Sequence, residues 1–121
     1  MTVNLDIEID ADILHVRAKG LRDRNTVLAI ARKIVEVSRE HGKTRVLVDV
    51  HELKGRLGTL DSHDVAFDDF PKIEGIDQYQ VAIVDDDIVD GIHPFEAFSR
   101  QQGLNFRIFG STIRAIDWLR E

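Results

Sequence analysis

The stretch Arg45-Val46-Leu47-Val48-Asp49-Val50 decides the fold of this 121-residue chain. It is nearly continuously apolar, which is typical of a strand covered on both faces, as in a parallel sheet. Asp49 is expected near the carboxyl end of this strand, where open α/β sheets place their ligands. The chain then reaches Thr59-Leu60-Asp61-Ser62, a sequence that favours a helix start. We therefore expect the functional surface between Arg45 and the helix that follows.

Two strands and one helix are expected before this stretch. Val3 to Ile9 alternates strictly between apolar and polar residues, which predicts an edge strand or one with a partly open face. Ile13 to Ala18 reads as a second strand, so the two should form an antiparallel hairpin. A helix with apolar residues at helical spacing follows, with Asp23 as its N-cap and Gly42 as its left-handed C-cap.

Two further helical regions and two strands are expected next. The helix that Thr59 should cap ends at Pro71, and its apolar anchors are Leu60, Phe67 and Phe70. Tyr79 to Val84 reads as a buried strand, and Asn105 to Phe109 as the last strand. Between them, a helical region from about Asp87 to Gln102 carries Gly91 and Pro94, which should break it or restart it.

A fourth helix is expected after the last strand, capped by Ser111, with Ile113, Ile116 and Leu119 facing the sheet. The order is therefore β-β-α-β-α-β-α-β-α. Strands separated by helices imply parallel pairing, and the leading hairpin makes the sheet mixed. We expect an α/β protein with one domain over residues 1–121, a five-stranded mixed sheet and four helical regions.

Composition excludes several functional classes. The formal net charge is −6, which argues against nucleic acids and anionic membranes as partners. The basic residues show no cluster beyond a thin series, Arg17, Lys19, Arg22 and Arg24. No apolar run is long enough to span a bilayer, and no signal peptide is recognised. The absence of cysteine removes thiolate metal sites and cysteine nucleophiles and fits a cytoplasmic location.

The order and size of the elements resemble the STAS fold (sulfate transporter and anti-sigma-factor antagonist). The passages that carry the resemblance are the second strand running into Gly20, EHGKTRVLVDV, YQVAIVDD and FRIFGSTIRAIDWLRE. The likeness is greatest to the SpoIIAA-like group, which shares an architecture with the lipid-binding CRAL-TRIO fold. The resemblance covers nearly the whole chain and implies a non-enzymatic regulatory or binding module.

In the phosphorylatable members of the resembling family, a kinase modifies the second serine of an Asp-Ser-Ser-Gly turn at a helix start. The nearest counterpart here is Asp61-Ser62-His63-Asp64. His63 occupies the acceptor position and Asp64 replaces the glycine. Asp61 and Ser62 are ordinary residues for the first turn of a helix. We therefore expect no phosphate on Ser62.

Strand-end carboxylates give an alternative function. Asp49 and the run Asp85-Asp86-Asp87 follow two strands that could be neighbours, and Mg²⁺ prefers oxygen ligands. An Mg²⁺-dependent phosphoacceptor or hydrolase using Asp49, Asp85 and Asp86 is the alternative function. However, no lysine follows the last strand, as it does in receiver domains. The simpler interpretation is that Asp85 to Asp87 cap the next helix.

The remaining polar residues give no catalytic constellation. The five histidines lie in separate elements without paired metal-ligand spacing, and Ser62 and His63 point apart on a helix. The glycines at 55 and 58 lack the spacing of a phosphate loop and indicate a mobile loop. We therefore expect no catalytic residues and no cofactor.

We expect the functional surface on the loop and helix from His51 to Phe70. We expect this segment to bind a protein partner or a small apolar, lipid-like ligand and to change conformation on binding. The sequence leaves open whether the protein forms a homodimer. Phe67, Phe70, Phe95 and Phe98 are core residues or line a groove between the two middle helices. The candidate surface consists of His51, Lys54, Arg56, Asp61, Ser62, His63, Phe67 and Phe70.

Overall fold

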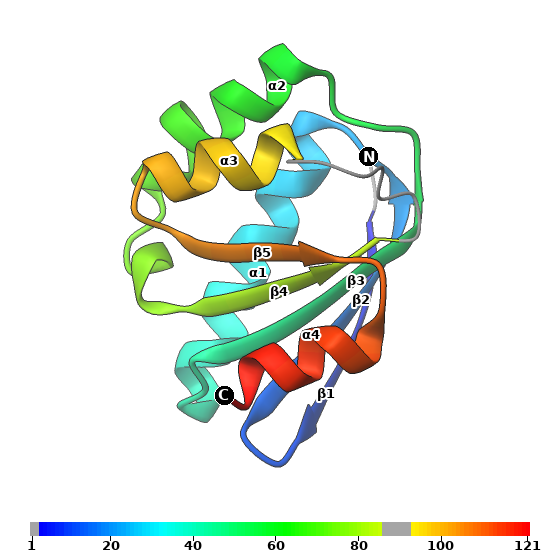
Figure 1. The fold of residues 1–121 in the computed structure, drawn as a ribbon, viewed down its shortest axis with the longest axis vertical. Helices are drawn as coiled ribbons and strands as arrows, with labels where there is room; N and C mark the ends of the chain where they lie inside the picture. Colours follow the sequence, from blue (N-terminus) through cyan, green and yellow to red (C-terminus); the bar gives the residue numbers. More distant parts are fainter. Residues whose placement is uncertain (1–2, 86–92) are drawn as a thin grey trace.

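A five-stranded sheet forms the centre of the computed structural model, which describes residues 3–85 and 93–121. The strands lie in chain order, β1-β2-β3-β4-β5 (Figure 1). Their bounds are Asn4–Asp10, Ile13–Leu21, Arg45–Lys54, Gln80–Val84 and Asn105–Phe109. β1 pairs antiparallel with β2, and the other three pairs are parallel. The predicted mixed sheet with its N-terminal hairpin is therefore confirmed.

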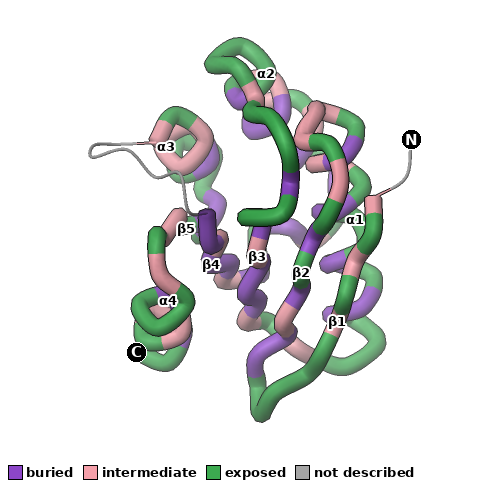
Figure 2. Tube along the Cα trace, turned by 90° about the vertical axis from the view of Figure 1, so that its right-hand side faces the viewer, coloured by how far each residue is buried: buried purple, intermediate pink, exposed green. Residues whose placement is uncertain are grey.

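Helices cover both faces of the sheet. Their bounds are α1 Arg24–His41, α2 Thr59–Asp64, α3 Pro94–Gln101 and α4 Thr112–Leu119. α2 continues without a break into a π-helix, η1 (Val65–Asp69), and two 3₁₀ turns follow, η2 (Phe70–Lys72) and η3 (Ile76–Gln78). Figure 2 shows α4 on one side of the sheet and α1 on the other. The four predicted helical regions are present, although residues 87–92 of the third lie outside the described part.

The apolar run in β3 divides between two core layers. Val46, Val48 and Val50 point into the larger layer, below α1 and α3, whereas Leu47 points into a smaller one below α4. Successive side chains of a strand point to opposite faces, so a strand covered twice needs apolar residues in unbroken succession. The prediction of a strand buried on both faces is confirmed.

β3 is longer than the sequence indicated, and Asp49 is not at its end. The strand runs on to Lys54 because β2 also continues, pairing Gly20 with Leu53 and Leu21 with Lys54 after an irregularity between Arg17 and Lys19. β4 stops pairing at Asp49. The expectation that Asp49 lies near the carboxyl end of the strand was wrong, because the strand continues for five more residues.

β1 is the edge strand that its alternating sequence predicted. Leu5 and Ile7 pack against the larger core layer, while Asp6 lies on the opposite face, directly across from Arg17 of β2. Because this face of the hairpin carries charged side chains, it needs no covering helix. Opposite charges facing each other across two strands also stabilise the pairing.

The caps of α1 and α4 are confirmed. The side chain of Asp23 accepts a hydrogen bond from the Thr26 amide at 2.8 Å, and that of Ser111 caps α4. Gly42 ends α1 with φ of +63°, the left-handed conformation that glycine adopts without steric cost.

Two expectations at the start of α2 were wrong. Gly58 takes the N-cap position, and Thr59 is the first helical residue, so Thr59 does not cap the helix. Leu60 is 73% exposed and does not anchor α2. The reason is geometric, because Leu60 lies off the buried face of the helical segment. The buried residues of that segment are Ser62, Val65, Ala66 and Phe70.

α3 and α4 bring two further corrections. His93 is the N-cap of α3 and Pro94 lies in its first turn, so Pro94 does start a helical segment, while Asp85 does not cap it. In α4, Ile113 is 74% exposed, whereas Ala115 and Leu119 are fully buried. The buried face is set by Ala115 and Leu119, four residues apart, and Ile113 lies off this face.

Candidate functional site

The larger core layer contains a cavity of about 490 Å³. It lies between α1, the central strands, α3 and the segment 55–72, which we call the lid because it covers the cavity. The wall is largely apolar and includes Ile34, Val48, Phe70, Phe95 and Phe106. The ring of Phe70 meets those of Phe95 and Phe106 edge to face, with centroids 5.7 Å and 5.6 Å apart. Interiors rarely leave such a volume empty, and ligand sites commonly have this size.

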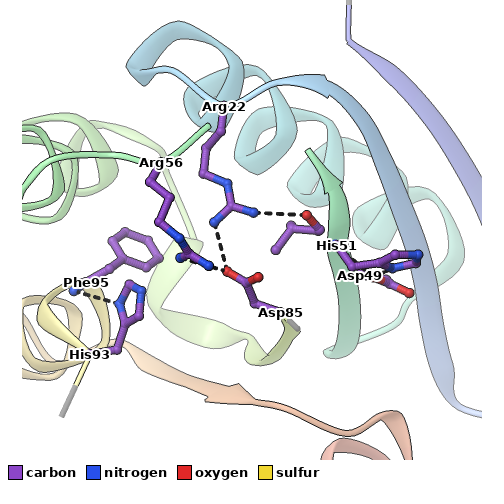
Figure 3. Close-up of polar contacts among 8 residues, drawn as sticks. Arg22, Asp49, His51, Arg56, Asp85, His93 and Phe95 are labelled. Carbon is purple, nitrogen blue, oxygen red and sulfur yellow. Dashed lines mark hydrogen bonds and ion pairs between the residues drawn. The ribbon is translucent and has the colours of Figure 1, made fainter. Parts of the chain in front are cut away.

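Four polar side chains gather at one end of the cavity: Arg22, Arg56, Asp85 and His93. We call this group the mouth. Figure 3 shows the four side chains pointing toward one another from separate parts of the chain. Arg22 follows β2, Arg56 lies in the loop before α2, Asp85 follows β4 and His93 precedes α3. The mouth is therefore assembled only by the fold.

Arg22 joins β3 to Asp85, the residue that follows β4. Its backbone amide donates to the Lys54 carbonyl at 2.7 Å, which fixes where the side chain starts. Its guanidinium donates to Asp85 Oδ2 at 2.8 Å and to the Val50 carbonyl at 3.0 Å (Figure 3). The side chain is only 11% exposed, and its Nε is buried without a hydrogen-bond partner among the described residues. A buried donor without an acceptor is costly.

Asp85 also contacts a second guanidinium group, that of Arg56. Arg56 Nη1 lies 3.4 Å from Asp85 Oδ2, and the backbone amide of Asp85 donates to the Phe109 carbonyl at 3.0 Å. The Asp85 side chain is 6% exposed, whereas that of Arg56 is 40% exposed and reaches solvent. A carboxylate so buried requires a charged partner, and here it contacts two.

His93 adds a neutral donor to the mouth. Its Nδ1 accepts a hydrogen bond from the Phe95 amide at 3.2 Å, so in the neutral ring the hydrogen lies on Nε2. Burial lowers the pKa of His93 below its ordinary 6.5, and the neighbouring positive charge of Arg56 lowers it further. The ring is therefore uncharged at neutral pH.

An ion pair fastens the lid to α1. Arg24 donates to both carboxylate oxygens of Asp69, at 2.7 Å and 3.0 Å, and lies 3.6 Å from Asp64. These hydrogen bonds hold the pKa of the Asp69 carboxyl below its usual value. A two-point contact of this kind fixes orientation as well as distance, so it sets where η1 lies over the cavity.

The outer side of the lid carries an aromatic cluster. The rings of His63 and Phe67 stack at 4.4 Å with an interplanar angle of 11°, and Phe98 of α3 meets both edge to face. Figure 1 shows α2 and α3, which carry His63 and Phe98, side by side. None of the three residues lines the cavity, so the predicted aromatic set divides into an inner pair, Phe70 and Phe95, and this outer cluster.

The structure distributes the eight residues of the candidate surface over three places. Arg56, Ser62 and Phe70 line the cavity, and His63 and Phe67 belong to the outer cluster. The remaining residues, His51, Lys54 and Asp61, are exposed on β3 and α2. Their role in binding stays a prediction.

Asp49 and Asp85, two of the three suggested magnesium ligands, have separate partners. His51 contacts Asp49 through both its ring Nδ1 and its backbone amide, while Asp85 contacts arginines (Figure 3). The third, Asp86, lies outside the described residues. Across residues 3–85 and 93–121, no group of three or more histidine or acidic side chains could hold a metal ion.

Sequence reasoning did not select Arg22 or His93. Arg22 belongs to the thin basic series from Arg17 to Arg24, and that series is the only signal that could have pointed to it. His93 gave none, because its position beside Arg56 depends on how α3 is placed. Side chains that meet only through tertiary packing leave no spacing in the sequence.

The fold is that of the SpoIIAA-like proteins. An anti-sigma factor antagonist from Mycobacterium paratuberculosis is similar over 99% of this chain and 96% of its own, with a TM-score of 0.59 and 16% identity. An uncharacterized protein of the DUF3478 family from Shewanella loihica PV-4, with a SpoIIAA-like fold, is similar over 97% of this chain and 93% of its own, with a TM-score of 0.50 and 21% identity. The predicted resemblance in fold is thus confirmed.

No protein-family model matches the sequence, and no curated protein matches it. Within the part of the chain that the structure describes, no helix has the length and apolar character needed to cross a membrane.

Proposed function

We propose that this protein is a non-enzymatic binding module that holds a small apolar ligand in the cavity beneath the lid. The cavity itself carries the proposal: its volume of about 490 Å³ lies within the usual range of ligand sites, and aliphatic and aromatic side chains form most of its wall. In the mouth, His93 Nδ1 already accepts a hydrogen bond from the Phe95 amide, so this nitrogen is not available to activate a nucleophile as a base.

A regulatory role follows from how the ligand would act on the lid. Phe70 belongs to both the cavity wall and the lid, so a bound ligand contacts the segment that also carries the outer aromatic cluster. Occupancy of the cavity would thereby change the stability of the outer surface. A cytoplasmic regulator that reports the presence of an apolar molecule is consistent with this arrangement.

A cavity-filling variant tests the proposal. Ala31 of α1 is buried and lines the cavity, while Ala29 of the same helix is exposed. We expect the unmodified protein to enhance the fluorescence of N-phenyl-1-naphthylamine and Ala31→Phe to lose that enhancement. Ala29→Phe is the matched control and should behave as the unmodified protein. Equal enhancement by both variants, or none by the unmodified protein, would reject the cavity as the site.

A protein partner is the second candidate, favoured by the exposed apolar surface on the lid. Leu60 is 73% exposed and lies three positions before His63 of the outer cluster in α2, a spacing that puts side chains on neighbouring parts of a helix surface. Contiguous exposed apolar patches mark interaction surfaces more often than single exposed apolar residues do. Native mass spectrometry of protein purified from its own host would show a bound chain that Leu60→Asp loses. Retention of that chain by Leu60→Asp would place the contact elsewhere.

A further inference from the structure

The outer edge of β1 is open. β1 is the first strand of the sheet, and β2 is the only strand that pairs with it among the described residues. Within the same residues, no hydrogen bond joins its backbone to another element. Residues of a strand direct their N–H and C=O groups alternately to its two sides, so those of every second residue in β1 point away from β2. Figure 2 shows β1 exposed or half-buried along its length.

The two edges of the sheet differ in how they are protected. At the β5 edge, the Ile108 amide donates to Glu96 Oε1 of α3 at 2.8 Å, so a side chain already occupies this donor. β1 pairs with β2 over seven residues without a shift of register, and Asn4–Asp10 contains neither proline nor lysine. Irregular pairing, proline and lysine are the usual means of keeping other chains from an edge strand. β1 is therefore the edge to which a further strand can be added.

The two faces of β1 have different chemistry. The face away from the larger core layer carries only polar and acidic side chains, and the core face carries only aliphatic ones. The first set is Asn4, Asp6, Glu8 and Asp10, and the second is Leu5, Ile7 and Ile9. Ile9 is 43% exposed, so the apolar layer is not closed at this edge. A strand added here continues both faces, with alternate side chains on each.

The acidic face has unused negative charge. Asp6 lies across from Arg17 of β2, whereas Glu8 lies across from His15 and forms no ion pair within the described part of the chain. Opposite charges on facing strands stabilise their pairing, and like charges destabilise it. The side chains of an added strand that face Glu8 and its acidic neighbours are therefore favoured when they are basic.

We propose that the β1 edge binds an extended segment of a partner protein in which basic and apolar residues alternate. The backbone of that segment pairs with the outward groups of β1. Its basic residues lie beside Glu8 on the acidic face, and its apolar residues extend the core layer beside Ile7 and Ile9. In strand addition, main-chain hydrogen bonds supply affinity and alternate side chains supply specificity. The surface is separate from the cavity and from the lid, so the inference does not depend on the function proposed above.

A second copy of this chain fits the edge less well. If β1 paired antiparallel with β1 of another copy and the core faces lay on one side, the carboxylates of the two strands would face each other. Like charges directly opposite each other are destabilising. The charge pattern therefore favours a different, basic chain.

Synthetic peptides test the pattern. The probe is a seven-residue peptide with blocked ends that alternates lysine and valine, because valine favours an extended backbone. In NMR titrations we expect it to shift the amide signals of residues 4–10 and to slow their hydrogen exchange, with no change in residues 105–109. A peptide with the same composition, but with its lysines in one block and its valines in another, should bind about tenfold more weakly. A peptide that alternates glutamate and valine should not bind.

A charge reversal on the protein tests the residue assignment. Glu8 is exposed, so Glu8→Lys should fold, and unchanged amide signals outside the hairpin would verify this. We expect Glu8→Lys to weaken binding of the lysine peptide about tenfold and to allow binding of the glutamate peptide. Glu40→Lys, at an exposed position of α1, makes the same change of charge and should alter neither affinity.

Four outcomes would overturn the proposal. They are equal binding of the alternating and block peptides, equal binding by Glu8→Lys and the unmodified protein, amide shifts confined to residues 55–72, and a dimer in sedimentation whose β1 amides are protected without peptide. The third would place the partner surface on the lid, and the fourth would show that a second copy covers the edge. None of them bears on the cavity, which the fluorescent ligand tests separately.

Discussion

At the scale of single residues, Arg22 determines the chemistry of the mouth. Its amide donates to the Lys54 carbonyl at the end of β3, and its guanidinium joins the Val50 carbonyl within β3 to Asp85 after β4. A guanidinium has five donors in a fixed plane, so it can join several acceptors, and here the N–H of Nε still has no acceptor among the described residues. A lysine here could supply the charge but not this geometry.

The histidine of the mouth gives a prediction about pH. Burial lowers the pKa of His93, Arg56 and Arg22 lower it further, and Asp85 and Glu96 oppose them. The pKa in the folded state is then below the unfolded value of about 6.5. Between these two values the unfolded chain binds more protons, so the free energy of unfolding falls as the pH drops below about 6.5.

Two measurements check this prediction. The His93 ring, followed by NMR, should titrate with a midpoint below 6.5. His93→Asn keeps an N-cap acceptor for α3, and its free energy of unfolding should decrease less between neutral pH and pH 5 than that of the unmodified protein. His41→Gln, at the exposed end of α1, serves as the control. A midpoint at or above 6.5 would contradict the prediction.

At the scale of elements, the lid depends on a few contacts. α2 has six residues and passes into a π-helix of five, a form that is rare and often occurs at functional sites. Its inward residues are few, and the ion pair between Arg24 and Asp69 supplies the polar attachment. Elements with so few anchors open at low free energy.

We expect Asp69→Asn to loosen the lid without unfolding the sheet. The amide side chain loses the charge that holds Arg24, so hydrogen exchange in residues 59–72 should become several-fold faster while exchange in β3 stays unchanged. Because the pKa of Asp69 is lowered in the folded state, its contribution is present above about pH 4 and is lost as the pH falls through the folded value. Asp68→Asn, on the exposed side of η1, is the control.

The two aliphatic positions of α4 give a second prediction for an element. Leu119 is fully buried and Ile113 is 74% exposed. Leu119→Ala should lower the free energy of unfolding by about 2–5 kcal/mol, since it removes apolar contact and leaves a void. Ile113→Ala should change it by less than about 0.5 kcal/mol, as expected for an exposed site. Chemical denaturation measures both, and equal costs would show that the exposed face of α4 is covered in solution.

At the scale of the whole molecule, the sheet and the lid differ in stability. β3 is paired on both sides and covered by two core layers, whereas the lid covers a cavity rather than a packed core. The ligand proposed above would supply contacts that the lid lacks. Its binding would then stabilise the lid by mass action.

Hydrogen exchange tests this difference directly. In the free protein, amides of residues 55–70 should exchange faster than those of 45–50. Addition of N-phenyl-1-naphthylamine should slow exchange in 55–70 and leave 45–50 unchanged. If both segments exchange equally slowly and neither responds, the lid is an ordinary rigid connection.

Local pattern alone determined the order of the elements. Its signals depend only on residues that are close in the sequence, so they can be interpreted without knowledge of the fold. They are the nearly unbroken apolar run at 45–50, the alternation at 3–9 and the helix caps at Asp23 and Ser111. The same holds for the mixed sheet, since helices between strands impose parallel pairing.

Tertiary structure alone decided which residues face inward at element ends and which polar groups meet. Leu60 and Ile113 each fit the apolar stripe of a helix in the sequence, yet both side chains are exposed in the structure. Arg22 and Asp85 are 63 positions apart, and their contact exists because β3 and β4 are neighbours in the sheet. Distances between such groups are set by strand order and helix placement, which no local pattern encodes.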